Sequence, residues 1–297
     1  MELTKDFIEA VVEALLNKRE KYGLSDKQFA TSMGIDPAVF SQIKNGKRDK
    51  LLSNGSWLTL GLDLGVRVNK RQWTAVETDV FKQISDDILF CKAYSKSRIF
   101  VDNCGIGKTF TAKYMASTQK NVFYVDCTQC SKKTAFIRTL ARVVGVEMNG
   151  RLVDIKERTK YYLSILENPI IIIDEAGALE KSALGLVQEY WNATENICGW
   201  YMMGANALRN KIQTGVSKDR DYFAELFSRF SDKFDSIVPT ERNQKRAFYK
   251  KLLTDVISAN VKDKNLINEL VNRSMIEQDG MITGLRRAES LIILYNA

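Results

Sequence analysis

Five short apolar runs between residues 98 and 239 constrain the fold of this chain more than any other feature. A strand that is apolar at nearly every position is buried on both faces, which is typical of a parallel sheet covered by helices. Helical stretches separate the runs, so the sequence predicts an α/β domain with a five-stranded parallel sheet flanked by helices. The runs are RIFVD (98–102), NVFYVD (121–126), PIIIID (169–174), GWYMMGA (199–205) and KFDSIVP (233–239).

A glycine-rich turn follows the first of these strands. The stretch VDNCGIGKTFT (101–111) nearly matches the phosphate-loop pattern G-x-x-x-x-G-K-[ST] in its strand–loop–helix context. In such a loop the backbone N–H groups face the phosphates, Lys108 reaches the β- and γ-phosphates, and the Thr109 hydroxyl ligates Mg²⁺. The predicted nucleotide-binding residues are Gly105, Ile106, Gly107, Lys108, Thr109 and Phe110.

Asp102 stands where the pattern has its first glycine. Aspartate is among the few residues other than glycine that tolerate a positive φ reasonably well. Its carboxylate would repel a triphosphate unless the side chain turns away and accepts backbone N–H bonds. We therefore expect nucleotide binding to survive, with altered affinity.

The strand PIIIID ends in adjacent carboxylates, Asp174 and Glu175. A buried strand would deliver Asp174 to the Mg²⁺ shell, and Glu175 can orient and activate an attacking water. The chain contains no histidine, so any hydrolysis must use carboxylates, lysines, arginines or a metal ion. Because both motifs end predicted strands of one parallel sheet, the sequence predicts a site for ATP and Mg²⁺.

The N-terminal part of the chain has a helix-turn-helix pattern over residues 24–46. Apolar residues repeat at helical spacing on both sides of Gly34, which permits a tight turn, and Asp36 and Pro37 are typical of the start of the second helix. The pattern resembles the λ-repressor family, in which the second helix enters the major groove of DNA. A helical hairpin used for protein contacts is the alternative. The candidate DNA-binding residues are Ser41, Gln42, Lys44 and Asn45.

Changes in composition divide the chain into three parts. The polar stretch VNKRQW around residue 70 is interpreted as a linker, and a helix is predicted over residues 74–92. After Thr240 the pattern predicts helices and no strand. We therefore expect a helix-turn-helix domain (1–70), a nucleotide-binding domain (71–239) and a C-terminal helical lid (240–297).

Charge and cysteine content narrow the functional classes. The net charge of +8 fits a nucleic-acid partner but also an ordinary solvated surface. Cys127 and Cys130 form a C-x-x-C, but a zinc site needs about four ligands and the chain has neither a second such pair nor a histidine. We interpret them as small residues at a strand end. The sequence shows no signal peptide or membrane-spanning run, so we expect a cytoplasmic protein with reduced thiols.

From about residue 74 onward, this order of motifs resembles the AAA+ ATPases. The resemblance implies that Asn206, after the fourth strand, holds the lytic water or senses the γ-phosphate. It also implies an arginine that reaches the neighbouring subunit's nucleotide, for which Arg229 is the first candidate and Arg220 the rival. A further arginine in the lid, Arg286 with Arg287 as its rival, would contact the same subunit's nucleotide.

The order of domains resembles, more narrowly, the transposition proteins of the phage Mu B type. This resemblance implies an ATP-dependent protein that forms helical filaments or rings on double-stranded target DNA, delivers it to a transposase and stimulates strand transfer. Two alternatives remain open: a helicase loader or replication initiator, and a repressor switched by nucleotide without turnover. The candidate phosphate contacts on DNA are Lys132, Lys133, Arg151 and Lys156.

Overall fold

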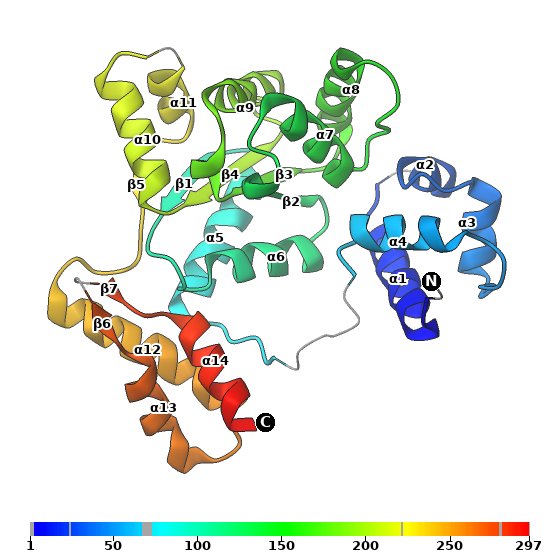
Figure 1. Ribbon diagram of the computed structural model, residues 1–297. Helices are drawn as coiled ribbons and strands as arrows, with labels where there is room; N and C mark the ends of the chain where they lie inside the picture. The colour runs from blue at the N-terminus through cyan, green and yellow to red at the C-terminus, as the bar shows by residue number, and fades with distance from the viewer. Residues whose placement is uncertain (1–2, 24, 67–72, 221, 279–280, 297) are drawn as a thin grey trace.

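The structure is a computed structural model that describes residues 3–23, 25–66, 73–220, 222–278 and 281–296. A sheet with helices on both faces lies at its centre, with the N-terminal helices to one side and the C-terminal helices below (Figure 1). Within the described ranges, no helix is both long and apolar enough to cross a membrane. The predicted linker around residue 70 falls largely on residues 67–72, which lie outside the described residues.

The predicted five-stranded parallel sheet is confirmed. Its order is β2-β3-β4-β1-β5, and every pairing between neighbours is parallel. The carboxyl ends of all strands therefore lie at one edge of the sheet. The strands are β1 (Ser97–Val101), β2 (Val122–Asp126), β3 (Ile170–Asp174), β4 (Gly199–Gly204) and β5 (Phe234–Asp235).

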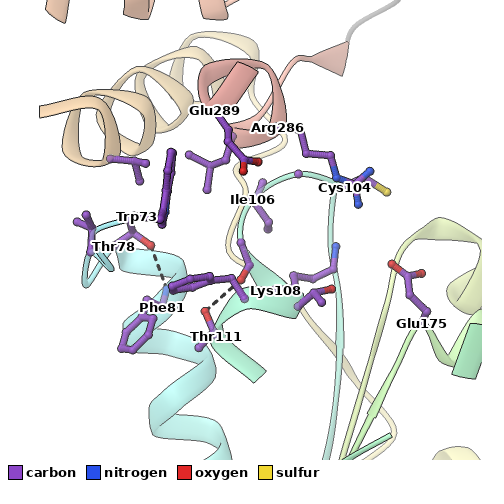
Figure 2. Close-up of a pocket in the computed structure, with 17 residues that line it drawn as sticks. Trp73, Thr78, Phe81, Cys104, Ile106, Lys108, Thr111, Glu175, Arg286 and Glu289 are labelled. Atoms are coloured by element: carbon purple, nitrogen blue, oxygen red, sulfur yellow. Dashed lines mark hydrogen bonds between the residues drawn. The ribbon is translucent and has the colours of Figure 1, made fainter. Parts of the chain in front are cut away.

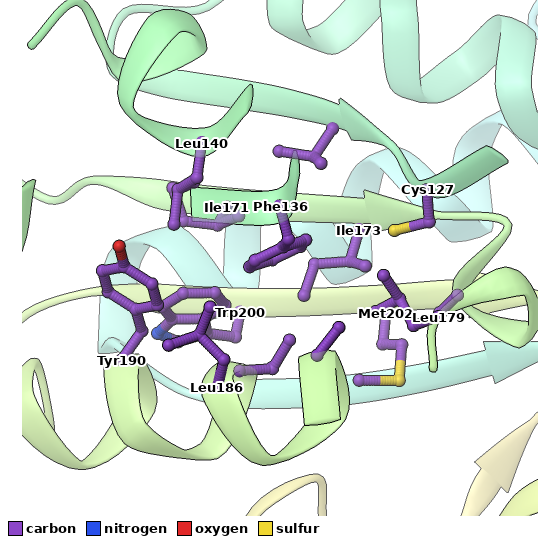
Figure 3. Packing of buried hydrophobic residues seen from close by; sticks show 14 of the residues in the cluster. Cys127, Phe136, Leu140, Ile171, Ile173, Leu179, Leu186, Tyr190, Trp200 and Met202 are labelled. Atoms are coloured by element: carbon purple, nitrogen blue, oxygen red, sulfur yellow. The ribbon is translucent and has the colours of Figure 1, made fainter. Parts of the chain in front are cut away.

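Both faces of the sheet are covered, because alternate residues of each strand enter different cores. Ile170 and Ile172 pack with α5 (Asp79–Tyr94) and α6 (Lys108–Thr118). Ile171 and Ile173 enter the opposite core, where Trp200 and Phe136 also lie (Figure 3). That core is covered by α7 (Lys133–Val144), α8 (Leu152–Ile165), α9 (Lys181–Ala193), α10 (Asn206–Ser217) and α11 (Phe223–Arg229).

The two helices predicted around Gly34 are present. Ser25 begins α2 with a capping box, and the Asp36 carboxylate caps α3 by accepting from Ala38 N and Val39 N. Gly34 joins them with a φ of 68°, a value that glycine adopts without strain. The N-terminal helices share a separate core, and they are α1 (Lys5–Glu20), α2 (Asp26–Ser32), α3 (Pro37–Lys44) and α4 (Asn54–Asp63).

The C-terminal part, called the lid below, contains α12 (Arg242–Asn260), α13 (Ile267–Ser274) and α14 (Leu285–Asn296) around their own core. It also contains a short antiparallel pair, so the expectation of no strand there was wrong. Two-residue strands are too short to show an alternating pattern. The pair is β6 (Glu277–Gln278) and β7 (Met281–Ile282). The lid also has a 3₁₀ turn at Lys264–Leu266, and two more 3₁₀ turns follow strands of the sheet, at Cys127–Gln129 and Ala176–Ala178.

Helix α5 begins at Asp79, five residues later than predicted. The Thr78 hydroxyl accepts from Phe81 N and caps the helix. The preceding segment is held by the lid instead, because Thr74 N donates to Asn260 Oδ1 at 2.8 Å and Asn260 Nδ2 donates to Thr74 O at 3.2 Å. These long-range bonds replace the helical ones that the apolar spacing predicted.

Tyr22 joins the N-terminal helices to the sheet domain. Its hydroxyl donates to Gly145 O at 3.4 Å, and its ring stacks on Tyr162 with 6.0 Å between centroids. An ion pair between Arg142 and Asp63, 3.5 Å long, adds a second contact between the same two parts. The N-terminal helices therefore rest on α7 and α8.

Replacing Tyr22 by alanine should loosen this contact, since an aromatic pair is worth about 0.5–1.5 kcal/mol beyond its buried area. Small-angle X-ray scattering should then give a larger radius of gyration at unchanged helix content. Tyr22→Phe keeps the ring and serves as the control, with the wild-type radius. Equal radii for all three proteins would contradict this description of the contact.

Candidate functional site

The phosphate-loop sequence forms a tight turn between β1 and α6. Gly105 has a φ of 75° and Gly107 a φ of 105°, both in the left-handed region that favours glycine. Helix α6 begins at Lys108, directly after Gly107, so the first-turn N–H groups point into the loop. This is the local geometry that binds a phosphate at a helix N-terminus.

The Lys108 side chain is buried and folds back over the loop. Its Nζ donates to Asp102 O at 2.8 Å and to Asn103 O at 2.6 Å. Burial lowers the pKa of Lys108, and the nearby acids Cys104, Asp102, Glu175 and Asp174 oppose this shift. The ammonium group therefore lies inside the loop, bonded to carbonyls that it can exchange for phosphate oxygens.

The phosphate loop and the carboxylate at the end of β3, the two motifs predicted from the sequence, are in direct contact. Thr109 Oγ1 donates to Asp174 Oδ2 at 2.7 Å, and Tyr124 Oη donates to the same oxygen at 2.9 Å. Asp174 is 1% exposed at the end of β3, and its other oxygen accepts from Glu175 N at 2.9 Å. A hydroxyl and a carboxylate oxygen at this separation suit a magnesium ion, which prefers oxygen ligands.

The Asp102 side chain turns away from the loop, as the sequence predicted for a site that still binds nucleotide. One carboxylate oxygen accepts from Asn103 N at 2.7 Å, and the other accepts from Ile237 N at 2.7 Å and Val238 N at 2.9 Å. Asp102 does not use its tolerance of a positive φ, because in this loop Gly105 and Gly107 adopt one instead. Beyond β5, which ends at Asp235, the N–H groups of Ile237 and Val238 therefore serve Asp102 rather than the sheet.

A cavity of about 370 Å³ lies above the loop, between the sheet domain and the lid. Trp73 and Phe81 lie toward one end of it, and Lys108 and Glu175 toward the other (Figure 2). An aromatic end and a phosphate-binding end match the two halves of a nucleotide. Nine of its lining residues were not predicted from the sequence: Trp73, Val76, Thr78, Phe81, Cys104, Thr111, Val256, Leu285 and Glu289.

The lid contributes an arginine to the cavity. Arg286 lines it from the first turn of α14 (Figure 2). Arg287 instead donates from Nε to Arg273 O at 2.9 Å, on the side of α13. The geometry therefore favours Arg286 over its rival.

The other residues that the AAA+ resemblance implied do not line the cavity. Asn206 is exposed at the start of α10, two residues after β4, and β4 lies between β3, which ends at Asp174, and β1, which ends at Val101. Arg229, at the end of α11, donates to Asn192 Oδ1 at 2.7 Å and lies 5.3 Å from the Trp191 ring centroid. The side chain of Arg220, its rival, is exposed.

The candidate DNA-binding side chains on α3 differ in their surroundings. Ser41 and Asn45 are exposed and Gln42 is half-buried. Lys44 Nζ bonds to Asp26 Oδ2 at 2.8 Å. This hydrogen bond is the main cause that lowers the pKa of Asp26, and a second hydrogen bond, from Arg19, lowers it further. The Asp26 carboxylate therefore partly offsets the charge of Lys44.

The four basic residues of the sheet domain that are candidates for DNA phosphate contacts differ in whether they form ion pairs. Lys132 and Lys133 are exposed where α7 begins, and the described residues form no ion pair with either. Arg151 pairs with Asp154 at 3.1 Å, and Lys156 pairs with Glu189 at 2.6 Å. The lysine pair is therefore the better candidate for a phosphate contact.

The C-x-x-C cysteines lie after β2, and both are buried free thiols. The hydrogen bond with Cys130, and then burial, raise the pKa of Cys127. Cys104 is the exposed free thiol among those described, and it lines the cavity.

Comparison with known proteins identifies the central fold. Residues 102–212 match the family model of the AAA domain. The solved structure of the Aeropyrum pernix Orc1 protein in complex with DNA is similar, with a TM-score of 0.52 and 14% identity over 74% of this chain and 59% of that chain. No curated protein sequence matches the chain. Residues 102–212 are therefore similar to an AAA domain, the chain shares the fold of the Orc1 structure, and it spans less than two thirds of the Orc1 chain.

Replacing Trp73 by alanine should weaken the binding of an adenine nucleotide about 5- to 150-fold, because stacking of a base on an aromatic ring is worth about 1–3 kcal/mol. Titration with a fluorescent adenine nucleotide measures this change. Trp73→Phe keeps a ring at the site and should bind within a few-fold of wild type. Unchanged affinity in the alanine variant would place the base elsewhere.

Proposed function

We propose that this protein is an ATPase that binds double-stranded DNA, assembles into helical filaments or rings on it, delivers it to a transposase and stimulates strand transfer. The hydrogen bond between Thr109, which lines a cavity of nucleotide size, and the buried Asp174 carries the ATPase part of the proposal. The DNA part is supported by the paired helices α2 and α3, by the exposed lysines at the start of α7, and by the similar fold of an Orc1 protein solved with DNA. The transposase and strand transfer rest on the resemblance to Mu B-type proteins.

The residues of the loop suggest how ATP binds. Lys108 exchanges the carbonyl oxygens of Asp102 and Asn103 for phosphate oxygens, while the N–H groups at the start of α6 bind the same phosphates. Thr109 and Asp174 would hold Mg²⁺, which supplies positive charge where the leaving phosphate develops negative charge. Arg286 reaches the cavity from the lid and adds a second cation.

Glu175 is placed to activate water. It lines the cavity beside Asp174 and is half-buried. Its backbone has a φ of 50°, an uncommon value for a residue other than glycine, and the Asp174 carboxylate holds its N–H. In the proposed reaction the Glu175 carboxylate accepts a proton from the attacking water, with Asn206 at the neighbouring strand end as a second contact.

Arg229 supports an assembly of several subunits. It does not line the cavity of its own subunit, and Asn192 and Trp191 hold it on the outer surface of α9 and α11. In the proposal Arg229 of one subunit completes the site of the next, and hydrolysis separates the two subunits and releases DNA.

Replacing Glu175 by glutamine should abolish phosphate release while ATP still binds, because the amide cannot accept the proton of the attacking water. Lys108→Ala, the paired control, should lose ATP binding as well. Phosphate release and nucleotide titration, each with and without double-stranded DNA, measure these effects. A Glu175→Gln protein that behaves as wild type would favour a nucleotide-switched repressor without turnover.

Replacing Lys132 and Lys133 together by alanine should reduce the salt dependence of DNA binding. Each lost phosphate contact lowers the slope of log affinity against log salt by about 0.9, so the pair should lower it by about 1.8. Filter binding over a series of salt concentrations gives the slope. Arg151→Ala with Lys156→Ala removes equal charge from residues in internal ion pairs and should leave the slope near wild type. An unchanged slope in the lysine variant would refute the assignment.

A further inference from the structure

Four hydrogen bonds, made by three loop residues, join the phosphate loop to the lid and to the segment that leads into it. Asp102 Oδ2 accepts from Ile237 N and Val238 N, in the stretch between β5 and α12. Asn103 Nδ2 donates to Tyr249 Oη, on α12, at 3.2 Å. Gly105 O accepts from Leu285 N, at the start of α14, at 2.8 Å. The loop therefore holds both the entry to the lid and its last helix.

The contact with Asp102 is the firmest of the three. The carboxylate is 8% exposed, and one of its oxygens accepts two N–H bonds at 2.7 and 2.9 Å. Hydrogen bonds to an ionised acceptor are about twice as strong as neutral ones. The backbone of Asp102 is itself held to the sheet, because its N–H donates to Gly204 O at 3.3 Å. A glycine at this position, as the usual loop pattern has, could not make the bonds to Ile237 and Val238.

Asp102 and its neighbour Asn103 also contact the lysine that is expected to bind phosphate. Lys108 Nζ bonds to the backbone oxygens of Asp102 and Asn103, and their side chains bond to residues 237, 238 and 249. When Lys108 turns to bind phosphate, these two peptide groups lose a charged partner. Any shift that follows is passed to the lid through the two side chains.

The last helix of the lid, α14, is also in close contact with the phosphate loop. Gly284 packs on Gly105 so tightly that an added Cβ would collide with the Gly105 carbonyl oxygen. Leu285 and Arg286 follow directly and line the cavity. A small displacement of the lid relative to the loop therefore changes what the cavity presents to a ligand.

We infer that Asp102 is a positioning residue that ties the start of the lid to the phosphate loop, so that phosphate binding at the loop sets the position of Arg286 over the cavity. This inference rests on the proposed binding and hydrolysis of ATP. In this inference Asp102 does not alter the contacts that the loop N–H groups and Lys108 make with the phosphates. Its effect is on the lid, and through the lid on turnover.

Hydrogen–deuterium exchange of the whole protein, with and without ATP and Mg²⁺, tests whether Asp102 couples the lid to the phosphate loop. The kcat and KM of ATP hydrolysis are measured for the same proteins. Asp102→Gly restores the usual loop residue and removes both side-chain bonds. The amides of Ile237 and Val238 should then exchange about tenfold faster or more without nucleotide, because hydrogen bonds to a charged group are lost. ATP should no longer change the exchange of residues 281–290, and kcat should fall about tenfold with KM little changed.

Asp102→Asn is the matched variant, since its carbonyl oxygen can still accept the two N–H bonds. It should restore slow exchange at residues 237 and 238, the response of the lid to ATP, and most of kcat. An Asp102→Gly protein that keeps the wild-type kcat and the wild-type ATP response of residues 281–290 would overturn the inference. If Asp102→Gly fails to fold, as thermal unfolding would show, Asp102→Asn with lid exchange unresponsive to ATP would overturn it as well.

The wild-type protein separates this inference from the proposed function. A wild type that neither binds nor hydrolyses ATP would refute the function. A wild type that does both, with residues 281–290 unaffected by ATP, would refute the inference alone.

Discussion

The parallel register of the central strands is the constraint on which the site depends. Val101 pairs with Gly204 and Asp126 pairs with Asp174, so the strands end level with one another. Because β3 is buried on both faces, a slip by one residue would exchange the two sets of isoleucines between cores of different shape. The register thus sets the position of Asp174, and the loop that leaves β1 brings Thr109 to it.

Buried charges at that edge are each bonded to the protein. Asp102, Lys108 and Asp174 are all less than 9% exposed, and each has at least two hydrogen bonds. An unpaired buried charge would cost several kcal/mol, so these partners are needed for the loop to keep its shape. The bonds of Lys108 go to carbonyl oxygens, which phosphate oxygens can replace. Asp102 Oδ2 instead accepts from the chain beyond β5, and Oδ1 accepts from Asn103 N.

The two helical parts are joined to the sheet domain in different ways. The N-terminal helices contact α7 and α8 through Tyr22 and an exposed ion pair, away from the cavity. The lid contacts the phosphate loop itself, through Asp102 and Gly105. In the proposed function, this arrangement lets the N-terminal helices bind DNA without entering the site, while the lid responds to the nucleotide.

The sequence by itself determined what depends on local patterns. Apolar runs predicted the five strands, while glycine spacing and strand-end carboxylates predicted the contact of residues 105–109 with Asp174 and Glu175. Long-range partners decided the rest. Thr74 pairs with Asn260 rather than continuing a helix, which leaves Trp73 at the cavity. Asp102 accepts from the N–H groups of Ile237 and Val238, beyond the end of β5. No local pattern contains these contacts, because their partners lie more than a hundred residues away and meet only when the sheet and lid pack together.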